Sequence, residues 1–164
     1  MRRPYIKKLS IALTTAALAL SLTACTGAGP NAATRLIKQV TDGVDLTVNT
    51  NGSDLTISNL LLIATEDGSA VVVGTIINHA QESDSLLSIS VANVPATLTG
   101  NVDLLQNVPL RFEGDQSTSK AVFDTVGAKA GTNVPVDLTF ARAGVVKINA
   151  IIRDKRDTYA AVTK

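Results

Sequence analysis

From Thr34 onward, apolar and polar residues alternate with a period of two, which is the spacing of half-buried β-strands. The alternation is clearest over residues 44–48, 87–91 and 134–140. Asn51-Gly52 separates two such runs, and this dipeptide is a strong hairpin signal. About eight strands with turn signals every 8–12 residues or so predict one antiparallel β-sandwich, Ig-like or cupredoxin-like.

One stretch breaks the alternation. Leu60, Leu61, Leu62 and Ile63 are four consecutive apolar residues, and they cannot all face one core from a half-exposed strand. Two interpretations stay open. The strand is buried on both faces or bulged, or its outer face is an apolar surface that docks on a partner. Gly74, inside a later β-branched run, indicates a bulge or a close backbone approach.

The N-terminal residues predict a secretory leader. Arg2, Arg3, Lys7 and Lys8 form a basic region, and the apolar run that follows (9–22) is too short to span a membrane. Residues 1–24 are predicted to be a signal peptide that is removed. Residues 25–33 contain glycines and a proline and predict a tether, and 34–164 predict the β-sandwich domain.

The end of the leader resembles a bacterial lipoprotein lipobox. Leu22, Thr23 and Ala24 precede Cys25, the one cysteine of the chain. The resemblance implies that the Cys25 thiol carries lipid and that the chain is held on the extracytoplasmic face of the cell membrane. Two or more acyl chains, at about 0.8 kcal/mol per buried CH₂, anchor a protein stably. Arg2-Arg3 also matches a twin-arginine export signal, although an ordinary basic region explains it too, so the export route stays open.

Composition excludes several function classes. Four of the 15 basic residues lie in the leader, whereas all 14 acidic residues follow it, so the chain from Cys25 onward is net acidic. No predicted face gathers basic residues, which argues against nucleic-acid binding. With no Trp and few aromatic residues, a stacking platform is not expected either.

Candidate catalytic groups are sparse. His79, Ser83 and Asp84 share one short loop without an oxyanion nest, and Ser117 with Lys120 fits a polar turn better than a nucleophile motif. We interpret Asp84 as a solvated loop carboxylate. The sequence therefore predicts no enzyme, no bound cofactor and no metal site.

Three segments in fixed order resemble the PCu(A)C family (DUF461) of extracytoplasmic copper chaperones, and most of all its divergent lipoprotein branch in actinobacteria. The similarity covers roughly residues 53–153, and the third segment is its most specific part. The segments are AVVVGTIIN (70–78) followed by DSLL (84–87), VPLRF (108–112), and VPVDLTFARAGVVKI (134–148).

The resemblance implies a cupredoxin-like sandwich, but not the copper chemistry. Family members bind Cu(I) through two His and two Met, the soft ligands that copper prefers. Residues 96–99 stand where the first His is expected and residues 120–123 where a His-x-Met is expected, and neither segment holds a ligand. The resemblance thus points to an accessory protein, with cytochrome oxidase or its assembly as the implied partner. The alternative is metal trafficking through other ligands.

Overall fold

The computed structural model describes residues 41–164, and in it the alternating stretches form eleven strands. Tight turns join the first strand to the second and the second to the third, and in them Asn51, Gly52 and Gly68 have the positive backbone φ that such turns need. The elements are β1 (Val44–Thr50), β2 (Ser53–Ala64), β3 (Ala70–Asn78), β4 (Asp84–Val91), β5 (Val94–Pro95), β6 (Thr97–Gly100), β7 (Asp103–Leu104), β8 (Leu110–Phe112), β9 (Ser119–Phe123), β10 (Asn133–Phe140), β11 (Gly144–Asp154) and a 3-10 turn, η2 (Asp157–Tyr159).

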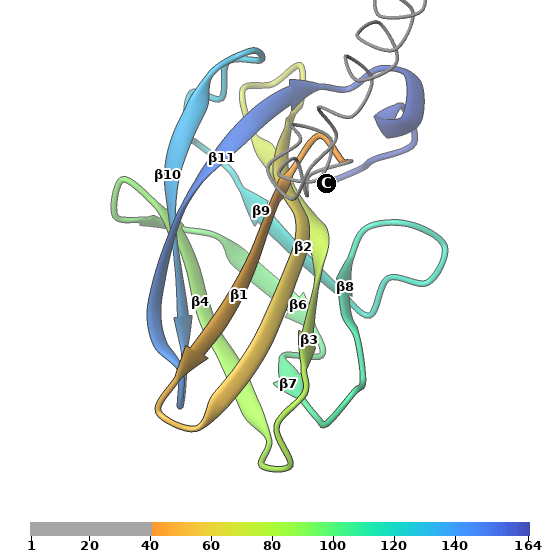
Figure 1. Ribbon diagram of the computed structural model, residues 1–164. Helices are drawn as coiled ribbons and strands as arrows, with labels where there is room; N and C mark the ends of the chain where they lie inside the picture. Colours follow the sequence, from red (N-terminus) through yellow and green to blue (C-terminus); the bar gives the residue numbers. More distant parts are fainter. Residues whose placement is uncertain (1–40) are drawn as a thin grey trace, which may run out of the picture. The chain divides into compact units, whose positions relative to one another are not determined.

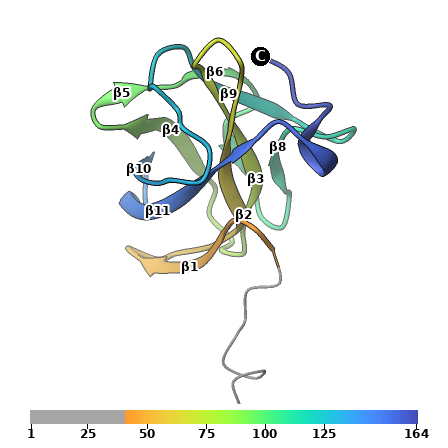
Figure 2. The ribbon, with the colours of Figure 1, turned by 90° about the horizontal axis from the view of Figure 1, so that it is seen from above.

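The strands make two layers (Figures 1 and 2). One layer has the order β5-β4-β10-β11, and the other runs β2-β3-β8-β9-β6, with β1 paired to β2. The layers meet where β11 pairs with β2 over Ile152–Asp154, so the sandwich is nearly closed on that side. This pairing and the single β8–β9 pair are parallel, whereas the other pairings between strands are antiparallel. The predicted all-β sandwich is confirmed.

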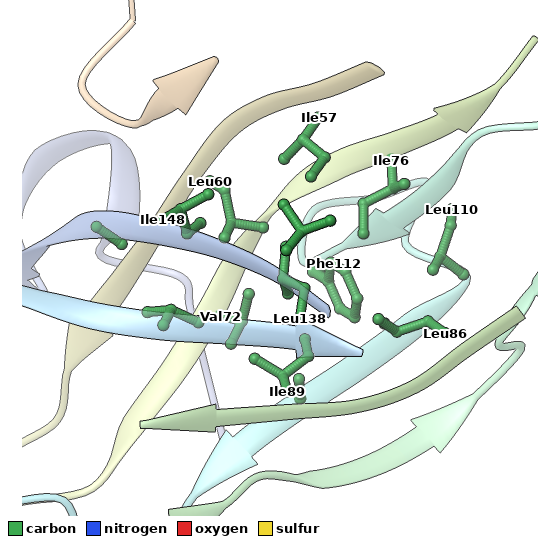
Figure 3. Close-up of a cluster of buried hydrophobic side chains, with 14 of the residues drawn as sticks. Ile57, Leu60, Val72, Ile76, Leu86, Ile89, Leu110, Phe112, Leu138 and Ile148 are labelled. Carbon is green, nitrogen blue, oxygen red and sulfur yellow. The ribbon is translucent and has the colours of Figure 1, made fainter. Parts of the chain in front are cut away.

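The core lies between the layers and consists of aliphatic side chains with three phenylalanines. Figure 3 shows Ile57, Leu60 and Val72 of one layer converging on Ile89 and Leu138 of the other. All five are fully buried. Since each fully buried aliphatic side chain contributes about 1.5–3 kcal/mol, this core stabilises the domain without a disulfide.

The bulge expected near Gly74 is present, and it lies in the partner strand. The β2–β3 register shifts between Ser58 and Leu61, where Asn59 adopts a positive φ of 52°. Gly74 sits opposite with φ 149°, and a Cβ there would lie 3.0 Å from the Leu60 Cα. The close approach predicted from the sequence is therefore confirmed, and it fixes which β2 side chains point inward.

The structure corrects the number of strands from about eight to eleven. β5 and β7 are two residues long, which is too short to produce a visible alternation. No helix among residues 41–164 is long and apolar enough to cross a membrane. The predicted leader (1–24), the tether (25–33) and the domain start at Thr34 fall outside the described residues, and they stay predictions.

Candidate functional site

The run Leu60–Ile63 is divided between two faces of β2. Leu60 and Leu62 belong to the main core, whereas Leu61 and Ile63 belong to a second apolar cluster on the outer face of the sheet. All four side chains are 0% exposed. The outer face is therefore covered in this structure, and partner docking at these residues stays a prediction. The alternative interpretation, a bulged strand buried on both faces, describes the segment.

The outer cluster is covered by the last residues of the chain. Leu61, Ile63 and Val71 pack with Val162, and Tyr159 joins them at the margin. Val73, Val122 and Ile151 complete the apolar surface. We call residues 157–164 the strap. Figures 1 and 2 show its helical turn beside the β3 and β8 side of the domain.

Polar contacts from the strap to the body are made by side chains. Lys164 Nζ donates to Asp67 Oδ2 at 2.6 Å and lies 3.6 Å from Asp124 Oδ1. Lys120 Nζ donates to Thr163 Oγ1 at 3.3 Å. The hydrogen bond from Lys164 lowers the pKa of Asp67 well below its ordinary range, with further help from Thr65 and Ser69. The same pair raises the pKa of Lys164.

Hollows flank the strap. One of about 430 Å³ lies between the strap and the loop after β8, and one of about 490 Å³ lies beside Asp67 and Lys164. A third, of about 370 Å³, borders β11 just before the strap.

The two segments at the expected copper-ligand positions are adjacent strands. β6 pairs with β9, with Thr97 opposite Val122 and Thr99 opposite Lys120. The Lys120 ammonium lies 3.3 Å from Glu113 Oε1. Hydroxyl groups and an ammonium are poor ligands for Cu(I), and the positive charge repels it. These residues do not fit a copper site.

The sequence candidates for catalysis are not assembled. The ring nitrogens of His79 lie 3.1 Å from Asn107 Oδ1 and 3.1 Å from Thr56 Oγ1, and no contact with Asp84 is formed. Lys120 contacts Glu113 and Thr163 instead of Ser117. Within residues 41–164, no three His, Cys, Asp or Glu side chains are grouped so that they could hold a metal ion.

Asp84 is the polar residue that the sequence interpretation misplaced. The residue is 3% exposed, and its carboxylate accepts hydrogen bonds from the backbone N–H groups of Arg142 and Ala143, at 2.8 and 3.0 Å, and from Ser53 Oγ at 3.3 Å. It therefore ties the β10–β11 turn to the start of β4. The available signal was its phase, since Asp84 shares the inward parity of Leu86.

This geometry defines an all-β sandwich with a covered outer face, and its fold is that of PCuAC domains. The chain is similar in structure to the copper-bound PCuAC domain from PmoF2, with a TM-score of 0.57 and 17% identity over 68% of this chain and 98% of that one. It is also similar to the apo PCuAC domain from PmoF1, with a TM-score of 0.56 and 19% identity over 68% of this chain and 99% of that one. For the apo PmoF2 PCuAC domain the TM-score is 0.57, with 16% identity over 70% and 98%. No protein-family model and no curated protein matches the sequence.

Proposed function

We propose that this protein is a non-enzymatic accessory protein, held by lipid at Cys25 on the extracytoplasmic face of the cell membrane, which acts by binding another protein. One observation carries the proposal. The chain has a PCuAC-like fold, yet it contains one His and one Met, so it cannot supply the two His and two Met implied by the family resemblance. A framework kept without those ligands favours protein contact over copper transfer.

The neighbourhood of the candidate residues supports the same conclusion. The His79 ring is engaged by Asn107 and Thr56, and the Asp84 carboxylate is saturated by donors of the protein itself. A nucleophile needs a base within hydrogen-bond reach, and neither group serves as one here. The leader and the lipobox residues Leu22, Thr23 and Ala24 support the membrane location. By resemblance, the leading partner is the respiratory chain, with cytochrome oxidase or its assembly first.

The test is a mild-detergent purification from native membranes by an affinity tag that follows a flexible linker after Lys164. We expect respiratory-chain subunits to co-purify at near-stoichiometric yield. The Cys25→Ser variant is the matched control, because it keeps the domain and removes the lipid. If the lipidated protein consistently elutes alone, the accessory function is refuted.

A second candidate, metal trafficking through other ligands, is favoured by one specific observation, the similarity to a PCuAC domain with copper bound. It is tested by titrating Cu(I) in competition with a strong chelator. The protein used begins at Gly27, so that the Cys25 thiol cannot bind the metal itself, and His79→Ala is compared with it. The accessory function predicts no retained copper in either protein. Retention that disappears in His79→Ala would establish the alternative.

A further inference from the structure

The strap covers a large apolar face with few contacts. Leu61, Ile63 and Val71 are fully buried, yet within the strap only Val162 is buried and Tyr159 partly so. Its other residues are exposed. The cover over this face is therefore a thin one, formed essentially by one aliphatic and one aromatic side chain.

Within the part of the chain that the structure describes, the backbone N–H groups of the strap donate hydrogen bonds only to carbonyl groups within the strap and to that of Arg156, just before it. Tyr159 N–H donates to the Arg156 carbonyl, Ala160 N–H to that of Asp157 and Val162 N–H to that of Tyr159. Among the described residues, no backbone hydrogen bond joins residues 157–164 to the sheet. Asp157, where the strap begins, has a positive φ of 51°. Opening the strap thus breaks no strand pairing, and local openings of this kind cost less than global unfolding.

The end of the strap is held by charge. Lys164 lies between Asp67 and Asp124, which belong to the β2–β3 turn and to the segment after β9. The apolar face and this acidic pair together form one surface, which favours two kinds of group in a ligand. It accepts an aliphatic side chain at its centre and a cation at its rim.

We propose that the outer face of β2, β3 and β9 is a docking site for a peptide segment of a partner protein, and that the strap is its intramolecular stand-in. The strap shows what the site accepts: an aromatic residue, an aliphatic residue three positions later, and a lysine or arginine two positions after that. The partner segment has this pattern and displaces the strap when it binds. The proposal rests on the accessory function, and it names the chemistry of the partner.

The competition between strap and partner sets the test. A tethered segment has an effective concentration in the millimolar range, so a free peptide of the same sequence binds wild type poorly. We use the chain from Gly27 onward, which contains the whole compact unit 41–164. The probe is a fluorescein-labelled peptide DTYAAVTK, amidated at its end, and its binding is followed by fluorescence anisotropy.

Val162→Ser weakens the strap, and the peptide is expected to bind this variant at least about tenfold more tightly than wild type. Release of the strap is monitored separately. Tyr159 is the one Tyr after the leader and the chain has no Trp, so iodide quenching of its fluorescence reports the strap alone. Lys164→Glu is the second variant, since that side chain is exposed and its replacement leaves the core intact. Val145→Ser, at a valine 58% exposed on β11, is the matched control and is expected to behave as wild type.

Specificity for the cation is tested with a peptide that ends in Glu instead of Lys, which is expected to bind Val162→Ser several-fold more weakly. Three results overturn the proposal: quenching of Tyr159 unchanged in both strap variants, a released strap without peptide binding, or equal binding of the two peptides. Because the assay contains only purified chain and peptide, its result is independent of the membrane purification. A failed purification and a failed docking site are thus distinguishable.

Discussion

Replacing Asp84 tests whether the buried carboxylate holds the end of the sandwich together. Its side chain accepts two backbone N–H groups of the β10–β11 turn and the Ser53 hydroxyl. Asp84→Ala removes the acceptor but leaves these donors in place. A buried N–H without a partner costs about 1–3 kcal/mol, so the two amides together give about 2–6 kcal/mol. The Ser53 hydroxyl can rotate to another partner, and we assign it no cost.

This loss is large against the stability of a domain, which is about 5–15 kcal/mol. The assay is urea unfolding of the chain from Gly27 onward, followed by far-UV circular dichroism. The midpoint is expected to fall while the slope with urea stays constant, because the surface exposed on unfolding is unchanged. Asp84→Asn keeps one carbonyl oxygen, and it is expected to lose about half as much.

Asp137→Ala is the matched control. Asp137 pairs with Lys147 at 2.9 Å across the exposed face of β10 and β11, and this lysine side chain is 74% exposed. Exposed ion pairs contribute about 0–1 kcal/mol. If Asp84→Ala costs no more than Asp137→Ala, the carboxylate does not organise the turn and the reasoning fails.

Four further predictions follow, three from the structure and the last from the sequence. Gly74→Ala is expected to lower the free energy of unfolding in urea by about 1–3 kcal/mol, because the added Cβ would meet the Leu60 backbone. Gly68→Ala is expected to cost less, since a Cβ at Gly68 would meet nothing within 4 Å. Equal costs would contradict the close approach at Gly74. The strap contacts, followed by Tyr159 quenching, are expected to stay constant between about pH 5 and pH 9. The pKa of Asp67 is lowered, so its contribution to the stability of the strap is lost only when the pH falls below 3.8. The pKa of Lys164 is raised, so its contribution is lost only when the pH rises above 10.5. Raising the ionic strength from about 0.1 M to about 1 M is expected to increase the quenching of Tyr159, because the Debye screening length falls from about 10 Å to about 3 Å and weakens the Lys164–Asp67 ion pair. No effect of salt would show that this ion pair is unimportant for the strap. Cys25→Ser is expected to leave the leader uncut and the chain unlabelled by radioactive fatty acid, and normal labelling would remove the lipobox assignment.

Much of the fold could be predicted from the sequence, because antiparallel strands and the turns between them leave a pattern in neighbouring residues. The period of two in residues 134–140 and the Asn51-Gly52 turn require only neighbouring residues for their interpretation. β5 and β7 were not predicted because two residues carry no period, and their strand character comes entirely from pairing with β4.

The candidate site was less accessible. The sequence indicated that Leu60–Ile63 was unusual but left open whether its outer face was exposed or buried. The answer depends on residues about a hundred positions later, since Val162 and Tyr159 cover Leu61 and Ile63. Asp84 was misplaced for the same reason, because its partners Arg142 and Ala143 lie in a distant turn.

By itself, the sequence determined the class of fold and the likeness to PCuAC domains. These properties depend on residue type and on local spacing, which the chain carries wherever it folds. Only the tertiary structure decided which apolar face is covered, where the buried carboxylate finds its donors, and that Lys120 stands beside Glu113 on the outer face of β9. Such properties depend on contacts between residues far apart in the chain. A short stretch of sequence does not show which distant residues it will contact, so it cannot predict them.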